Sequence, residues 1–368
     1  MRADDGDAPG PVAQGDGRPR LVGRVGSLDA FWPLVEPLLA GLHPRRLCEI
    51  GVDEGIFTRR LLAWGREHGC TYVGIDPAPN PSAAGLINPP GRLVPGQSVD
   101  VLPTLEACEA YFIDGDHNYH TVRRELDLIA RARPAAGPLV FAHDVGWPWA
   151  RRDMYHAPDA LPPEARHLSS NDLGVSLDGD ELVPGGLCSP GRYVIAQHAG
   201  GERNGVLTAV EDFLRDGAAE GWRGLIVPMA YGLAVLYRPD TVPEQCRSVL
   251  EGLEAACRVL GPFLESCEAN FLSLYLYAEA AKSQLAYWTG DGQPGQAAHE
   301  RSQRDYQELQ TVYGELSSAH GTLGEAYEGL SSAYRDLAAH SEKLLEDYRH
   351  LLDVYTVLES TSRRERDA

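Results

Sequence analysis

The chain has 368 residues, of which 43% are hydrophobic and 23% charged, a composition typical of a globular protein with ample core. Its formal charge of −20 at neutral pH disfavours nucleic acid and anionic membrane surfaces as partners. A membrane span requires about 20 apolar residues in a row, and no stretch of the sequence approaches that length. The 7 cysteines are scattered singly, which indicates reduced thiols and predicts a cytoplasmic protein.

The first part of the chain changes character near residue 25. Residues 1–24 are rich in Gly, Pro and Asp and lack the apolar core of a signal peptide, so we expect a disordered lead-in. From about residue 27 to 43, Phe31, Leu34, Val35, Leu38 and Leu39 recur at helical spacing. This pattern predicts a helix at the start of a domain that spans residues 25–242.

Strand and helix patterns alternate through this domain. Apolar runs predict strands at 46–51, 71–76, 92–95, 109–114 and 138–143, and helical patterns fall at 55–68 and 119–131. Strands separated by helices indicate βαβ units and a parallel sheet. A helix at 206–215 precedes strands at 224–228 and 233–238, which are close enough to pair as an antiparallel hairpin. We therefore expect an α/β fold, mostly parallel, with its last strand antiparallel.

The alternation breaks down between residues 146 and 204, which hold many Pro, Gly and Asp residues. Insertions longer than about 15 residues in a compact domain are usually lids or binding loops, so this segment is predicted to be a lid over the substrate. Aromatic residues stand beside Arg151 and Arg152 at its start. Either these groups stack on a ring and hold an anion, or they pack the lid while Asp153 pairs with an arginine.

Helical patterns dominate the last third of the chain. Residues 243–299 are expected to form a helical linker, and residues 300–360 a coiled coil. The d positions of its heptads are Leu309, Leu316, Leu323, Leu330, Leu337, Leu344, Leu351 and Leu358. This pattern predicts a homo-oligomer, either dimer or trimer. The alternative is an intramolecular hairpin onto residues 264–285.

Two motifs early in the domain indicate a ligand site at the strand ends. The first strand ends in Glu49, turns through Gly51 and Gly55 and enters a helix, and such glycines let a ligand approach the backbone closely. The nicotinamide fingerprint G-x-G-x-x-G is absent from this turn. Asp76 ends the second strand, where an acid can accept hydrogen bonds from both ribose hydroxyls of an adenosine cofactor.

A third motif follows the fourth strand. The run Asp-Gly-Asp-His-Asn-Tyr over residues 114–119 places two carboxylates and the imidazole of His117 after an apolar segment. Ligands of open α/β sheets bind beyond the carboxyl ends of the strands, so these groups are candidates for chemistry. The alternative is a turn that caps the next helix. His143 and Asp144 end the fifth strand in the same way.

These segments resemble the class I methyltransferases, which bind S-adenosylmethionine (SAM). More narrowly, Gly-Gln-Ser-Val-Asp-Val-Leu-Pro at residues 96–103 resembles the segment along adenine in catechol-type O-methyltransferases. The run at 114–119 and Phe-Ala-His-Asp-Val at 141–145 resemble those enzymes and the macrocin-type sugar O-methyltransferases. The resemblance covers about residues 45–238 and only loosely the lid.

The resemblance implies a Rossmann-like sheet and assigns roles to residues. It implies that SAM is bound by Glu49, Gly51, Gly55, Asp76, Gln97, Ser98 and Asp114. It also implies a divalent metal held by Asp114, His143 and Asp144. Magnesium is the expected ion, with manganese or iron as alternatives, because His143 stands where the family usually has a second carboxylate.

The methyl acceptor must lose a proton, and a histidine of near-neutral pKa is the usual base. His117 occupies the position at which catechol-type enzymes carry a lysine base, and His143 is its competitor. The predicted activity is methyl transfer from SAM to a hydroxyl of a small molecule, either a sugar or a secondary metabolite. The alternatives are a non-methylating relative linked to hydroxylation, and a scaffold that works through its coiled coil.

Overall fold

The computed structural model describes residues 27–289, except 133, 135, 177–178, 185, 189–190, 192 and 218–219. The predicted disordered lead-in (1–24) and the predicted coiled coil (300–360) lie outside the described residues. The chain divides into two compact units with the boundary after Leu276, and every strand of the described chain belongs to the first.

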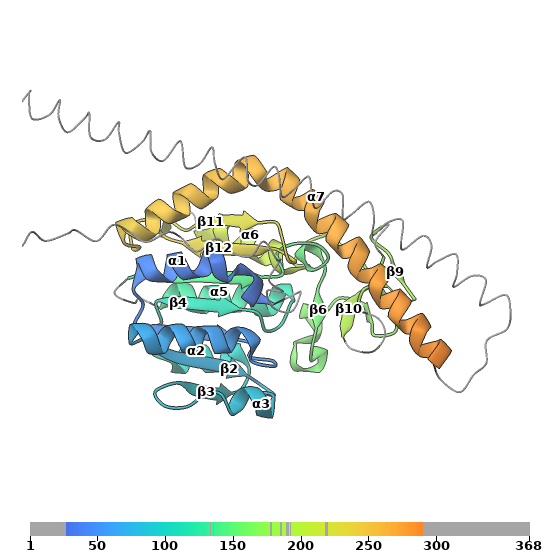
Figure 1. Cartoon of the computed structure of the whole chain (residues 1–368), viewed down its shortest axis with the longest axis horizontal. Coiled ribbons are helices and arrows are strands. Elements are labelled where there is room, and N and C mark those ends of the chain that lie inside the picture. The colour runs from blue at the N-terminus through green and yellow to red at the C-terminus, as the bar shows by residue number, and fades with distance from the viewer. Residues whose placement is uncertain are drawn as a thin grey trace, which may run out of the picture. The chain divides into compact units, whose positions relative to one another are not determined.

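A seven-stranded sheet forms the centre of the first unit (Figure 1). Its order is β11-β12-β5-β4-β1-β2-β3. In chain order these strands are β1 (Arg46–Ile50), β2 (Thr71–Asp76), β3 (Arg92–Pro95), β4 (Ala110–Ile113), β5 (Leu139–His143), β11 (Arg223–Val227) and β12 (Leu233–Tyr237). Strands β1 to β5 are mutually parallel, and β12 runs antiparallel to both β5 and β11. The predicted α/β fold, with its antiparallel last strand, is confirmed.

Helices cover both faces of this sheet. Helices α1 (Trp32–Leu42, after the 3-10 turn η1, Leu28–Phe31) and α2 (Ile56–His68) pack on one face, in a core that includes Leu47, Phe112 and Phe141. Helices α5 (Tyr119–Arg131) and α6 (Val206–Gly217) pack on the other, together with the short α4 (Ser98–Val101) and η2 (Leu102–Thr104). The one-turn α3 (Pro81–Ala84) lies between β2 and β3 in the chain. The three layers explain why the central strands β4 and β5 are almost fully apolar: both of their faces are covered, whereas the edge strand β3 is partly exposed.

The predicted lid has a small core of its own. Strands β6 (Met154–Tyr155), β10 (Val194–Ala196) and β7 (Ser169–Ser170) form one sheet, and β8 (Gly174–Val175) pairs with β9 (Leu182–Val183). The 3-10 turn η3 (Trp149–Arg151) precedes β6, and η4 (Pro158–Ala160) and η5 (Pro163–Ala165) lie between β6 and β7. Trp149, Met154, Val175, Leu187 and Ile195 pack together beneath these strands.

Helix α7 (Glu244–Thr289) follows the sheet. Its first turns are held in the main core by Cys246 and Leu250, and Leu272 is buried again further along. Between these points Val259 and Phe263 are exposed. Within the described part of the chain, no helix combines the length and apolar character needed to cross a membrane.

Candidate active site

The glycine turn after β1 is shaped by the neighbouring strand. Gly51 has φ +88°, and a Cβ on it would lie 2.3 Å from the carbonyl oxygen of Asp114. Gly55 has φ +76° and begins α2 as its N-terminal cap. The missing side chain at Gly51 therefore lets the β1 turn and the β4 turn pack directly against each other.

Asp76 closes this turn from the end of β2. Its Oδ2 accepts hydrogen bonds from the backbone N–H groups of Val52 (2.9 Å) and Asp53 (3.2 Å), and its Oδ1 accepts one from Ala78 (2.8 Å). Asp76 thus connects the turn after β1 to the turn after β2 by hydrogen bonds. The predicted contact with a ribose stays a prediction.

Glu49 does not face the crevice at the strand ends. Its carboxylate is buried, and it accepts hydrogen bonds from the hydroxyls of Thr58 on α2 (2.8 Å) and Tyr72 on β2. Burial raises the pKa of Glu49 to about 8, against the opposing effect of these two hydrogen bonds. The structure therefore gives Glu49 hydrogen bonds inside the protein, and its predicted role at the cofactor stays a prediction.

Gln97 and Ser98 lie at the start of α4, beyond the end of β3. Gln97 is exposed, whereas Ser98 is buried and donates its hydroxyl hydrogen bond to Glu125 of α5. Glu125 is fully buried, which raises its pKa to about 8, and its Oε2 has no hydrogen-bond partner in the described structure. This pair fixes α4 against α5 beside the predicted adenine segment.

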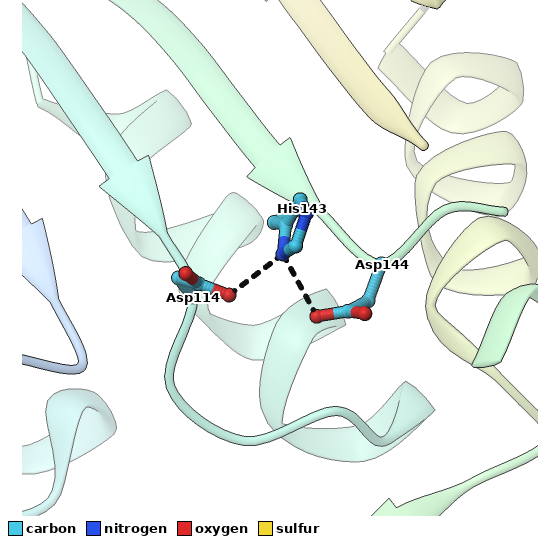
Figure 2. Close-up of side chains that lie close together, drawn as sticks. All are labelled: Asp114, His143 and Asp144. Atoms are coloured by element: carbon cyan, nitrogen blue, oxygen red, sulfur yellow. Dashed lines mark hydrogen bonds and ion pairs between the residues drawn. The ribbon is translucent and has the colours of Figure 1, made fainter. Parts of the chain in front are cut away.

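The three predicted metal ligands converge at the ends of β4 and β5 (Figure 2). One donor atom from each of Asp114, His143 and Asp144 lies within 4.8 Å of the others. The His143 Nδ1 is 2.9 Å from Asp114 Oδ1 and 3.0 Å from Asp144 Oδ2. Asp144 has φ +62°, an uncommon conformation for a residue other than glycine, and such strain is concentrated at functional sites.

The tautomer of His143 decides what this cluster can hold. The His143 Nε2 is 2.8 Å from the carbonyl oxygen of Ala230, an acceptor, so Nε2 carries the proton. In the neutral ring the Nδ1 lone pair then points at two carboxylates, which requires either a cation between them or a second proton on the ring. Burial lowers the pKa of His143, but the charges of Asp144 and Asp114 outweigh it and raise that pKa well above its usual value. Two carboxylate oxygens and an oriented imidazole nitrogen form a donor set that fits a divalent cation.

His117 lies on the other side of Asp144. Its Nδ1 is 2.7 Å from Asp144 Oδ2, and its side chain is mostly buried. Burial lowers the pKa of His117, but the charge of Asp144 and its hydrogen bond raise that pKa to about 9. The two histidines that were predicted as candidate bases therefore share the carboxylate of Asp144. Only His117 keeps its Nε2 free of a hydrogen bond to any described residue.

Two aromatic residues of the predicted lid, which were not among the predicted site residues, form a pair beside His117. His156 follows β6, and its ring centroid is 5.5 Å from that of His117 and 5.1 Å from that of Tyr193. The backbone N–H of His156 donates to Asp116 at 3.3 Å. Helical or strand periodicity gives no signal for such a contact, although the clustering of aromatic residues at 147–156 did mark the segment.

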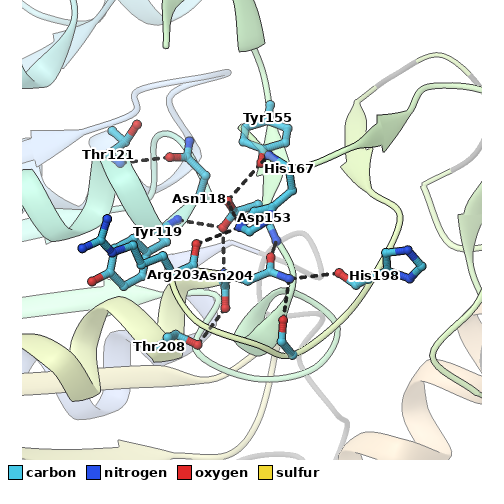
Figure 3. Close-up of polar contacts among 12 residues, drawn as sticks. Asn118, Tyr119, Thr121, Asp153, Tyr155, His167, His198, Arg203, Asn204 and Thr208 are labelled. Atoms are coloured by element: carbon cyan, nitrogen blue, oxygen red, sulfur yellow. Dashed lines mark hydrogen bonds and ion pairs between the residues drawn. The ribbon is translucent and has the colours of Figure 1, made fainter. Parts of the chain in front are cut away.

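Asp153 anchors the lid to the domain (Figure 3). Its fully buried carboxylate accepts hydrogen bonds from the N–H groups of Tyr119 (2.8 Å) and Gly205 (2.7 Å) and from the Tyr155 hydroxyl (3.0 Å). It thus joins the first residue of α5 to the residue preceding α6. The residue after Asp153 contacts His117 directly, because the Met154 N–H donates to the His117 carbonyl at 3.0 Å.

The neighbouring arginines serve the lid as well. Arg152 is buried and donates to the backbone carbonyls of Ala196 (2.6 Å) and Gln197 (3.0 Å). Arg151 pairs with Glu211 of α6 at 2.6 Å. Of the two readings of this segment, packing of the lid is the one that the contacts support, with Asp153 bound to backbone N–H groups and not to an arginine.

The comparison with known families bears on the strands that carry these groups. Residues 48–145, which run from β1 to the turn after β5, match the family described as a methyltransferase domain. This segment is a methyltransferase domain by its family match, in agreement with the resemblance to class I methyltransferases. The predicted resemblance is confirmed, and the matched segment contains the glycine turn, Asp76, His117 and the cluster of Asp114, His143 and Asp144.

Solved methyltransferase structures show similarity at low sequence identity. The SAH-bound methyltransferase PaMTH1 of Podospora anserina is 16% identical, with 57% of this chain and 77% of that chain covered and a TM-score of 0.34. The O-methyltransferase of Bacillus cereus in complex with SAH is 14% identical, with 58% and 84% covered and a TM-score of 0.36. The MycE methyltransferase of the mycinamycin pathway, in complex with Mg, SAH and mycinamycin VI, is 16% identical, with 32% and 31% covered and a TM-score of 0.25. A search of curated proteins found no significant match.

Proposed function

We propose that this methyltransferase domain transfers the methyl group of SAM to a hydroxyl of a small molecule, with a divalent cation at Asp114, His143 and Asp144 and with His117 as base. The observation that carries the proposal is the convergence of these three donors, within 4.8 Å of one another, at the strand ends where open α/β sheets bind ligands.

The donor chemistry supports a cation there. Two of the three donors are carboxylate oxygens, which suit Mg²⁺, so Mg²⁺ is the first candidate. The imidazole favours softer ions, so Mn²⁺ and Fe²⁺ are its competitors. When bound, a dication acidifies a coordinated hydroxyl and offsets the carboxylate charge around His117. SAM would lie over the glycine turn between Gly51 and Asp76, adjacent to this cluster.

His117 is suited to accept the proton of the acceptor hydroxyl. Its Nδ1 is held by Asp144, so the proton on Nδ1 points at the carboxylate. A dication that offsets the carboxylate charge would lower the raised pKa of His117 and make its Nε2 lone pair available. A base that is oriented by a carboxylate in this way keeps one tautomer and one ring direction. The alternative base, His143, has both ring nitrogens engaged and is buried, which favours His117.

The lid is the proposed acceptor side of the site. His156 and Tyr193 form an edge-to-face pair next to His117, and aromatic faces of this kind bind the rings of sugars and phenols. The negative charge of the chain and the presence of a lid favour a small acceptor over a macromolecule. A small hydroxylated ring compound is therefore the proposed class of substrate.

Calorimetry of SAM binding, with and without Mg²⁺ or Mn²⁺, tests the proposal first. We expect SAM to bind, and we expect Mn²⁺ to bind with an affinity that Asp114→Asn lowers at least about tenfold, as measured by electron paramagnetic resonance. Asp127→Asn, on the exposed side of α5, is the matched control and should bind Mn²⁺ normally. Formation of SAH with a panel of phenols and glycosides then tests the acceptor class.

Each arm of this experiment has a contrary outcome. Absence of SAM binding would overturn the methyltransferase proposal as a whole. Turnover on a hydroxyl acceptor that is unaffected by chelators and by Asp114→Asn would leave methyl transfer standing and remove the metal from it. Transfer to nitrogen or sulfur acceptors alone would replace the proposed hydroxyl chemistry.

A further inference from the structure

Helix α7 contacts the loop that orients His143. The Glu268 carboxylate accepts two backbone hydrogen bonds from the β11–β12 loop: Oε2 from the Ala230 N–H and Oε1 from the Tyr231 N–H, both at 2.8 Å. The carbonyl of the same Ala230 accepts the hydrogen bond from His143 Nε2, also at 2.8 Å. Glu268 is thereby joined to the proposed metal cluster through one peptide segment.

The loop needs such a clamp because its backbone is strained. Ala230 (φ +50°) and Tyr231 (φ +66°) are consecutive residues in the left-handed region, and Gly232 follows with φ +82°. A residue other than glycine is strained in the left-handed region, so the loop adopts this conformation only where its surroundings hold it. A bidentate carboxylate on two adjacent N–H groups supplies that restraint with charge-assisted hydrogen bonds. The direct contact between the Tyr231 carbonyl and the Gly146 N–H (2.5 Å) holds the other side of the loop.

We propose that Glu268 is a positioning residue of this site: through Ala230 it fixes the ring orientation and the Nε2–H tautomer of His143. The bound cation in this inference rests on the proposed function, whereas the orientation of the His143 ring by Glu268 does not. It assigns to α7, which lies outside the residues that match the methyltransferase family, a role in setting the geometry between β4 and β5. Outer partners of a metal-binding histidine typically account for about 10–100-fold in metal affinity.

The direct test is nitrogen-15 NMR of the histidine rings in the full-length protein without metal. The His143 signals are identified by their loss in His143→Gln. We expect wild type to show a His143 Nε2–H that exchanges slowly with solvent, because the Ala230 carbonyl accepts its hydrogen bond, and Glu268→Ala to show faster exchange of the same proton. Glu265→Ala, one turn earlier on α7 with an exposed side chain, is the matched control and should give the wild-type spectrum.

Two further measurements separate positioning from folding. Glu268→Gln keeps one carbonyl oxygen for the loop, so it should give an intermediate His143 spectrum. If Glu268→Ala unfolds, as judged by circular dichroism, Glu268→Gln alone decides. Mn²⁺ affinity is expected to fall about 10–100-fold in Glu268→Ala, with SAM affinity unchanged because the glycine turn lies at β1.

The outcomes distinguish this inference from the proposed function. A wild-type His143 spectrum in folded Glu268→Ala, or in Glu268→Gln where that variant alone folds, overturns the positioning role. If wild type binds no Mn²⁺ and no Mg²⁺, the metal part of the proposed function fails. The metal-free His143 spectrum still tests the role of Glu268 in that case.

Discussion

His117 and Asp144 form the shortest contact between an imidazole and a carboxylate at the strand ends, with 2.7 Å between Nδ1 and Oδ2. The same Asp144 oxygen lies 3.0 Å from His143 Nδ1. One carboxylate thus connects the proposed base to the proposed metal cluster. Burial raises the pKa of Asp144, but the two histidines outweigh it and hold that pKa below its usual value, so Asp144 stays ionised between them.

His117→Gln tests the proposed base. We expect the rate of methyl transfer to fall by about 10²–10⁴-fold, because no base then takes the proton of the substrate hydroxyl. Calorimetry should show unchanged SAM affinity. His120→Gln, in the first turn of α5, is the control and should retain the wild-type rate. Equal rates for His117→Gln and wild type would assign His117 to a structural role as a partner of Asp144.

Much of the sheet was predictable because its strands are short apolar runs that end in glycine or acidic residues. Burial on both faces makes such runs continuous, and the helices between them carry a 3.6-residue period. The lid strands were not predictable: β6 to β9 have two residues each, too few for any period to register. Their pairing is set by contacts such as the one between Tyr155 and Val194, which are far apart in the chain.

The site, too, has contacts that the sequence could predict and contacts that it could not. Asp114 and Asp144 follow strands that lie side by side, so their meeting could be predicted from the fold class. Strand alternation also predicts the burial of Glu49, because it shares a strand face with Leu47, which packs beneath α1 and α2. The contacts of His143 with Ala230 and of Ala230 with Glu268 span 87 and 38 residues, and no local pattern encodes them.

Glu125→Gln tests the pH dependence of stability. Glu125 has a pKa of about 8 when folded and 4.5 as its ordinary value, so the folded state binds its proton more tightly. The stabilisation is complete below pH 4.5 and is lost as the pH rises through 8, an effect on the order of 5 kcal/mol. Glutamine cannot ionise, so the variant should lose less stability than wild type between pH 5 and 9 in urea denaturation.

Glu49 provides a check on this prediction, because burial also raises its pKa to about 8. Glu49→Gln should flatten the same pH range by a similar amount, and the double variant should flatten it further. Parallel curves for wild type and Glu125→Gln would show that Glu125 is ionised in the folded protein at neutral pH.

Asp153→Ala tests the anchor of the lid. The substitution leaves the N–H groups of Tyr119 and Gly205 without their acceptor, and each unsatisfied buried group costs about 1–3 kcal/mol. We expect the free energy of unfolding to fall by about 3 kcal/mol or more in thermal or urea denaturation. Asp159→Ala, whose side chain is fully exposed, should change stability by less than about 0.5 kcal/mol. Similar losses in both variants would rule out a special role for the Asp153 contacts.

Gly51→Ala tests the close packing of the β1 and β4 turns. Both Gly51 (φ +88°) and Gly69 (φ +66°) are left-handed, but a Cβ at Gly51 would lie 2.3 Å from the Asp114 carbonyl oxygen, whereas nothing lies within 4 Å of a Cβ at Gly69. Gly69→Ala should therefore show only the backbone cost of about 1–2 kcal/mol. Gly51→Ala adds a backbone clash, so we expect a loss of about 3 kcal/mol or more and weaker SAM binding, because the Asp114 turn must move. Equal destabilisation of the two variants in urea denaturation would mean that backbone conformation alone, and not the approach of Asp114, selects glycine at position 51.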